Sequence, residues 1–251
     1  MKIQQIRNAT LKIQYGDQTI LLDPWLQDKG TGLSAPTVNQ KMEGVRQPMN
    51  ELPMAPQEIL SGVDFCLVTH IHPDHFTADY LPKEIKIIVQ NEEDRDKAAE
   101  MGFSETASFE GDELRIGNVT ITKVPALHGD NSTVAEMMGK GSGYILSGEE
   151  KTLYIAGDTV YYESVEKTLE KYKPNVIALN CCEATIPVGR LIMNLSDVEK
   201  VCRKMPDAQV IATHLDSVNH ALVTSSDVKE FAQNHGLTNL CVPANGEQLL
   251  L

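Results

Sequence analysis

The stretch LVTHIHPDHF places three of the chain's seven histidines and one aspartate within six consecutive positions. His70 and His72 are two residues apart, so in an extended segment their rings fall on the same side. Pro73 disfavours a helical conformation at His72 and bends the chain, which brings Asp74 and His75 round as a second pair. Imidazole nitrogens and carboxylate oxygens form the ligand set of zinc-type metal ions. The spacing therefore predicts a metal site.

Three further metal-capable side chains stand at the ends of predicted strands. His128 follows VTITKVPAL, Asp158 ends LYIAGD, and His214 ends AQVIATH. Ligands of α/β proteins gather at the carboxyl ends of strands, where several strands can deliver side chains to one cavity. Together with the cluster, these residues make seven candidate ligands, enough for two metal ions with three protein ligands each and one shared carboxylate.

The elements that position these residues follow from the hydrophobic pattern. Residues 64–69 are a nearly continuous apolar run, which is typical of a strand buried on both faces. TLKIQYGDQTILLD predicts two strands joined at Gly16-Asp17, and MKIQQIRNATLKIQY is predicted as a strand. Other strands are predicted at 85–89, 113–126, 142–147, 153–158, 175–180, 208–215 and, closing the chain, 240–242.

Helices are predicted between these strands, so the chain should be a mixed α/β domain with helices covering sheets. Asn91 caps a helix over 92–101, and an amphipathic helix covers 165–172. Ser196 and Glu199 form a capping-box pattern that opens a helix to residue 205. A last helix begins at residue 226 or 227 and ends near Gly236.

Length and composition favour one α/β domain over residues 1–251. The N-terminal residues alternate between polar and apolar types, which is unlike a signal peptide. The five cysteines are irregularly spaced and offer no disulfide framework. The cytoplasm is therefore the expected compartment. A formal charge of −13 argues against a nucleic-acid partner, and no apolar run suits a membrane span. A small-molecule substrate is expected, and a homo-oligomer is left open.

Two segments have more than one interpretation. Residues 24–61 form a long irregular stretch, which in a compact domain is usually functional, with a plain surface insertion as the alternative. Cys181 and Cys182 are adjacent and would point in opposite directions, so they are interpreted as a buried thiol and a loop residue and not as metal ligands.

H-x-H-x-D-H with a downstream His, Asp and His resembles the metallo-β-lactamase superfamily. Three segments resemble the branch of cytoplasmic metal-dependent hydrolases in this superfamily, which includes the ascorbate-6-phosphate lactonase type. These segments are IRNATLKIQYGDQTILLDPWL, LPMAPQEILSGVDFCLVTHIHPDH and ATHLDSVNHALVT. The resemblance implies a four-layer αββα sandwich with the metals at one edge. It also implies that Asp23 supports the site from behind the ligands and that Asn8 faces the cavity.

The resemblance assigns each candidate ligand to a metal. The first metal would be held by His70, His72 and His128, the second by Asp74, His75 and His214, and Asp158 would bridge the two. Two divalent ions are expected, zinc first and manganese as the alternative.

The activity implied is a hydrolase that uses a metal-activated hydroxide at a binuclear site to cleave a small ester, lactone or phosphodiester. Catalytic roles are expected for Asp74, which would take the proton of the water, for the bridging Asp158, and for His220. His220 or Asp216 would protonate the leaving group, although His220 could instead cap the following helix.

Three alternatives remain at this point. A di-iron redox enzyme of the same fold would carry glutamate where this chain has His72, which favours zinc or manganese chemistry. A nuclease is opposed by the acidic charge. The last alternative is a non-catalytic module that binds a metal or a ligand.

Overall fold

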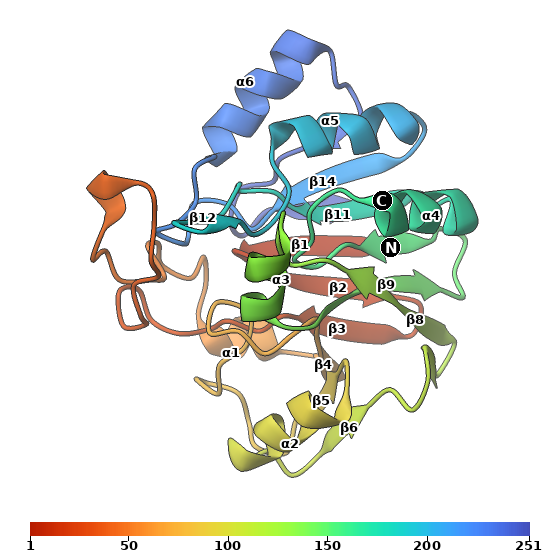
Figure 1. Ribbon diagram of the computed structural model, residues 1–251. Coiled ribbons are helices and arrows are strands. Elements are labelled where there is room, and N and C mark those ends of the chain that lie inside the picture. The colour runs from red at the N-terminus through yellow and green to blue at the C-terminus, as the bar shows by residue number, and fades with distance from the viewer.

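A computed structural model describes all 251 residues, and two seven-stranded sheets form its centre (Figure 1). In spatial order the first sheet contains β16 (Gln248–Leu250), β1 (Lys2–Arg7), β2 (Thr10–Tyr15), β3 (Gln18–Leu22), β4 (Phe65–Val68), β5 (Lys86–Val89) and β6 (Thr106–Ser108). The second contains β15 (Leu240–Cys241), β14 (Gln209–Thr213), β11 (Val176–Asn180), β10 (Leu153–Ile155), β9 (Gly141–Ser147), β8 (Val119–Ala126) and β7 (Glu113–Ile116). A small ribbon pairs β12 (Thr185–Ile186) with β13 (Gly189–Arg190).

Helices cover the outer faces of both sheets (Figure 1). The first sheet is covered by α1 (Pro56–Leu60) and α2 (Glu92–Glu100), and the second by α4 (Glu163–Tyr172), α5 (Leu195–Lys204) and α6 (Ser225–His235). The short α3 (Ser132–Met138) follows β8, and one 3-10 turn, η1 (Gln40–Met42), lies in the long loop. The predicted four-layer αββα sandwich is confirmed.

Apolar side chains on successive strand residues separate into the layers of the core. In β4, Phe65 and Leu67 belong to the cluster between the sheets, whereas Cys66 and Val68 pack beneath α1 and α2. This alternation follows from the two-residue repeat of a strand, and it explains why the run is apolar at every position. The interpretation of this run as a strand buried on both faces is confirmed.

Several local predictions are confirmed by the structure. β2 and β3 form an antiparallel hairpin in which Tyr15 pairs with Gln18. Asn91 caps α2, and its side chain accepts a hydrogen bond from the backbone N–H of Asp94. The four N-terminal backbone N–H groups of a helix lack intrahelical partners, and this bond satisfies one of them.

Three local predictions are wrong. The N-terminal stretch is two strands, not one, because the chain turns at Asn8 with φ of +54°. Asn194, not a capping box at residue 196, caps α5, since the Asn194 side chain accepts from the N–H of Asp197. The last strand is β16, which pairs antiparallel with β1. Asparagine tolerates the left-handed conformation, so a tight turn can interrupt an alternating pattern without glycine or proline.

The parallel part of each sheet sends strand ends to a common edge. β4 is parallel to β3 and β5, and β11 is parallel to β10 and β14. The segments that follow β4, β10 and β14 carry His70, Asp158 and His214. The fold therefore gathers the candidate ligands at one edge of the two sheets, beside the long loop that precedes α1.

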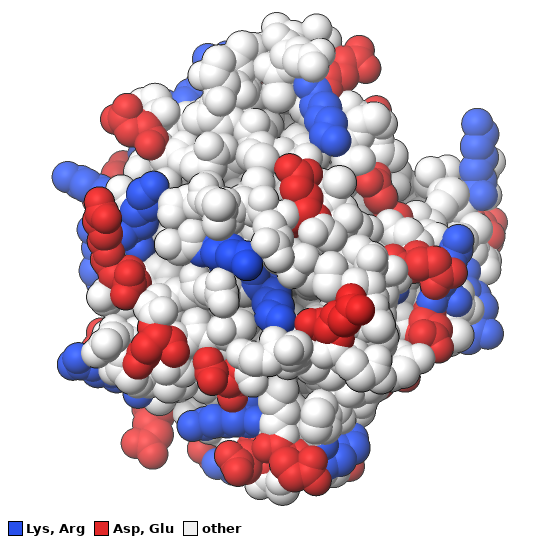
Figure 2. All heavy atoms as spheres, turned by 180° about the vertical axis from the view of Figure 1, so that it is seen from behind, with Lys and Arg blue, Asp and Glu red and all other residues white.

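The surface mixes charges of both signs. On the face shown in Figure 2, lysine and arginine side chains are interspersed with aspartate and glutamate side chains. None of the helices combines the length and the apolar character that crossing a bilayer requires.

Candidate metal centre

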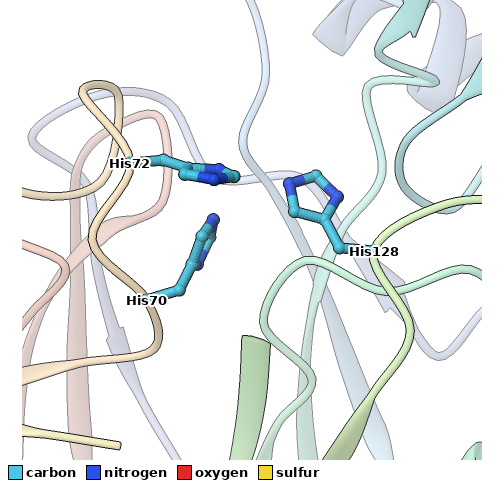
Figure 3. Close-up of side chains that lie close together, drawn as sticks. All are labelled: His70, His72 and His128. Carbon is cyan, nitrogen blue, oxygen red and sulfur yellow. The ribbon is translucent and has the colours of Figure 1, made fainter. Parts of the chain in front are cut away.

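The structure brings all seven candidate ligands together. His70 and His72 follow β4, His128 follows β8, and the three rings converge on one space (Figure 3). Their donor atoms form one group that could hold a metal ion, with all atoms within 4.8 Å of one another. The other two such groups consist of His70, His75 and Asp158, and of Asp74, His75 and His214.

Asp158 lies at the centre of this cluster. Its Oδ2 is 3.2 Å from Nε2 of His75, 3.4 Å from Nε2 of His128, 3.9 Å from Nε2 of His70 and 4.0 Å from Nε2 of His214. The Nδ2 of Asn180 donates to the other oxygen, Oδ1, at 2.6 Å. This bond fixes the carboxylate so that one oxygen faces the imidazoles of both predicted metal groups.

Asp23 and Thr69 orient two of the imidazoles. The Thr69 hydroxyl and the Nδ1 of His75 each lie 2.8 Å from Oδ2 of Asp23. Because the carboxylate can only accept, both donate to it, and the Thr69 oxygen is left to accept from Nδ1 of His70 at 3.1 Å. Both rings therefore carry a proton on Nδ1 and direct Nε2 towards the cluster, the orientation that a metal ligand needs.

Two further ligand rings have partners that the sequence did not indicate. The Nδ1 of His128 lies 3.1 Å from the carbonyl oxygen of Leu191, and the Nδ1 of His214 lies 3.5 Å from Sγ of Cys182. Both cysteines of the CC pair are buried, and both lie in the loop that follows β11. Cys182 contacts the ring of a candidate ligand.

Backbone conformation at the site is unusual. Asn8, Asp23 and His214 have φ of +54°, +42° and +63°, in the left-handed region that few residues other than glycine adopt. Hydrogen bonds hold these residues in place: the N–H of His214 donates to the carbonyl of Asn8 at 3.0 Å, and the N–H of Asp23 donates to that of Leu67 at 2.9 Å. Strain of this kind concentrates at functional sites.

Asn8 is completely buried and contacts the cluster, but it is not among the residues that line the cavity described below. Its Nδ2 donates to the carbonyl oxygen of Asp74 at 3.0 Å and lies 3.2 Å from Nε2 of His214. The N-terminal hairpin thus contacts two of the ligands proposed for the second metal.

The histidines of the first predicted metal group are neutral near pH 7 in the metal-free protein. Burial lowers the pKa of His70 and of His128, and burial together with the neighbouring His128 ring lowers the pKa of His72 to about 4. A neutral imidazole can donate a lone pair without first losing a proton.

The second group is electrostatically different. Burial would lower the pKa of His75, but the carboxylates of Asp158 and Asp23 outweigh it and raise this pKa to about 10. Asp158 likewise overcomes the effect of burial on His214 and raises its pKa. Burial would raise the pKa of Asp158 itself, but the surrounding imidazoles hold it well below its usual value. Protonated rings thus balance buried carboxylates in the metal-free protein.

The donor set fits divalent metal ions. Nε2 of His70 is buried and has no hydrogen-bond partner within the protein. A buried polar atom without a partner is unfavourable, and a cation at the convergence of the rings would satisfy it. The mixture of imidazole nitrogens and carboxylate oxygens is suited to zinc or manganese.

A cavity of about 450 Å³ opens above the cluster. Its floor includes His72, Asp74, His128, Asp158 and His220. The irregular stretch over residues 24–61 supplies a large part of its wall, so this stretch belongs to the site and is not a plain surface insertion.

His220 lines the cavity and does not cap the following helix, because Thr224 caps α6 through a capping box with Asp227. Burial lowers the pKa of His220, so its ring is neutral near pH 7. Asp216, the other predicted proton donor, is not among the lining residues, and its Oδ1 accepts a hydrogen bond from the N–H of Ser225.

The fold and the cluster together define a metallohydrolase of the β-lactamase superfamily. Residues 18–215 match the family model described as "Beta-lactamase superfamily domain", so the chain belongs to that superfamily. Within it, the chain belongs to the UPF0173 family of metal-dependent hydrolases. It is 35% identical to UPF0173 protein YddR of Bacillus subtilis over 98% of both chains.

Two solved structures match nearly the whole chain. A "possible metal-dependent hydrolase" of Veillonella parvula is 32% identical, with a TM-score of 0.94 over 100% of this chain and 99% of the other. An isothiocyanate hydrolase from Delia radicum gut bacteria is also 32% identical, with a TM-score of 0.93 over the same shares of the two chains.

Proposed function

We propose that this metal-dependent hydrolase holds two divalent ions, zinc first, and cleaves a small neutral molecule, with isothiocyanates as the leading substrate class. The observation that carries the binuclear proposal is the position of Asp158, whose Oδ2 lies within 4.0 Å of four imidazole nitrogens from both predicted metal groups. His70, His72 and His128 would hold one ion, and Asp74, His75 and His214 the other.

The composition of the cavity supports a neutral substrate. None of its lining residues is lysine or arginine, the residues that proteins use to bind phosphate groups. This composition disfavours the phosphodiesters, and also a phosphorylated lactone of the ascorbate-6-phosphate type. Isothiocyanates, simple esters and lactones remain, and the likeness to the isothiocyanate hydrolase supports isothiocyanates as the leading class.

Bound metal ions lower the pKa of a water towards neutrality and polarise an electrophile. Water would add to the central carbon of R–N=C=S, the C–N bond would then break with proton transfer to nitrogen, and the products would be R–NH₂ and carbonyl sulfide. Asp74 would accept the proton that the water loses and pass it to the nitrogen, and the remaining hydroxyl proton would reach the nitrogen as the C–N bond breaks. His220, neutral and at the cavity floor, would donate a ring N–H hydrogen bond to the leaving nitrogen.

A substrate screen tests this function. We expect the zinc-loaded protein to release amine and carbonyl sulfide from isothiocyanates faster than it cleaves esters or lactones, and His220→Gln to lower kcat by about 10²-fold, the usual contribution of a positioned proton donor. Amine and gas release are measured together. Turnover of esters or lactones alone would contradict the isothiocyanate assignment, and iron content with oxygen consumption would support the redox alternative.

Substitution of Cys182 should weaken the binding of the second metal ion more than the binding of the first. Its sulfur is the hydrogen-bond partner of Nδ1 of His214, and loss of such a partner typically weakens metal binding about 10- to 100-fold. We expect Cys182→Ala to weaken one of two bound ions in a chelator titration, with Cys182→Ser restoring part of the affinity. Cys202→Ala, a buried cysteine in the same apolar cluster but at α5, is the control. Equal weakening in both alanine variants would contradict this role.

A further inference from the structure

The walls of the cavity above the metal cluster are mainly apolar. One wall consists of Met137 and Met138 on α3 with Ile186 and Leu191 from the segment around the β12–β13 ribbon. The side chains of Leu33 and Pro36, from the long loop, also line the cavity. The charged groups among the lining residues are confined to the floor, where Asp74 and Asp158 belong to the metal cluster.

Two of these apolar side chains are unusually exposed. Leu33 is 71% exposed and Met137 is 57% exposed, although both line the cavity. Exposed apolar groups that cluster at a concave site mark a surface that a ligand covers. A volume of about 450 Å³ also exceeds what a three-atom N=C=S group or a single ester group needs.

The loop that carries Leu33 is held in place by hydrogen bonds from residues close to the metal cluster. The guanidinium of Arg7, next to Asn8, donates to the carbonyls of Trp25 and Gln27 at 2.8 and 2.7 Å. Asn219, next to His220, accepts from the N–H of Ala35 and donates to its carbonyl. The apolar part of the cavity is therefore built on the same frame as the metal centre.

We propose that the substrate carries an alkyl or aryl body that packs between the α3 methionines and the loop around Leu33, while its electrophilic carbon lies at the metal centre. This inference rests on the proposed function and specifies its substrate class. Methionine side chains are flexible and polarisable, so they adapt to bodies of different shape. The site should therefore select for buried apolar area more than for one particular shape.

A chain-length series tests the inference. For methyl, ethyl, butyl and hexyl isothiocyanate, we expect kcat/KM to rise about fourfold for each methylene that is buried. Leu33→Ser and Met137→Ser should flatten this rise, because each removes apolar surface from the cavity wall. Both side chains are exposed, so both variants should fold. Met101→Ser, at an exposed methionine that ends α2 and does not line the cavity, is the control.

The outcomes separate this inference from the proposed function. Equal kcat/KM for the methyl and hexyl compounds would overturn the inference that the substrate carries an apolar body, but it would leave the proposed hydrolase function standing. If no isothiocyanate is hydrolysed, binding still decides, because the chain's one tryptophan, Trp25, lines the cavity and its fluorescence reports occupancy. The metal-loaded protein is then titrated with ethanol, butanol and hexanol. A Kd that falls about fourfold per methylene supports the inference, and a Kd that does not fall with chain length overturns it.

Discussion

Replacement of Asp158 by asparagine should lower the hydrolytic kcat by about 10²- to 10³-fold, the range seen when one preorganised electrostatic group is lost from an active site. The substitution keeps the size of the side chain but removes the negative charge that lies within 4.0 Å of four imidazole nitrogens. A neutral amide oxygen is a much weaker ligand than a charged carboxylate oxygen, so it should not hold two cations at the position of Oδ2. We therefore expect metal analysis to find about one ion per chain instead of two.

The metal content and the fold are measured separately in this experiment. Asp207→Asn, at an exposed aspartate that lies outside the cluster, should keep both ions and full activity. Circular dichroism and the thermal midpoint of the stripped proteins show whether Asp158→Asn folds. A variant that folds, binds two ions and turns over normally would show that Asp158 does not bridge the two sites.

The local part of the site could be predicted because its geometry is encoded within a few residues. His70 and His72 share a side through the two-residue repeat, and Pro73 forces the bend that presents Asp74. His128, Asp158 and His214 could be added because strand ends of one sheet meet at a common edge. None of these arguments needs the register between strands.

The supporting residues could not be predicted because they depend on register. The parallel pairing of β11 with β10 brings Asn180 to Asp158, and its pairing with β14 places Asn180 opposite Thr213 and so brings Cys182 to His214. A shift by one residue would turn these side chains to the other face. The residue types alone gave Cys182 no role, because an isolated cysteine is most often only a buried apolar group.

The second metal site should bind its ion with a much steeper pH dependence than the first. In the metal-free protein the carboxylates of Asp158 and Asp23 raise the pKa of His75 to about 10, and Asp158 raises the pKa of His214. His75 is therefore protonated at neutral pH, and because its Nε2 lies 3.2 Å from Nε2 of His214, a proton must leave this pair before both nitrogens can bind a metal. In the first group burial lowers the pKa of the histidines, that of His72 to about 4, so these rings are already neutral.

The sign of the effect follows from this difference. When a metal displaces protons from its ligands, its affinity rises with pH by about tenfold per pH unit for each proton released. When a metal displaces no proton, its affinity does not depend on pH above the pKa of its ligands. Metal-stripped protein is titrated with zinc between about pH 5.5 and 8.5, and the released protons are counted by calorimetry in two buffers of different ionisation enthalpy. We expect one ion to remain bound and the other to be lost as the pH falls.

Asp23→Asn should reduce the proton release of the weaker site, because it removes one of the carboxylates that keep His75 protonated. Two ions with the same pH slope would contradict the charge balance inferred for Asp158 and its surrounding histidines.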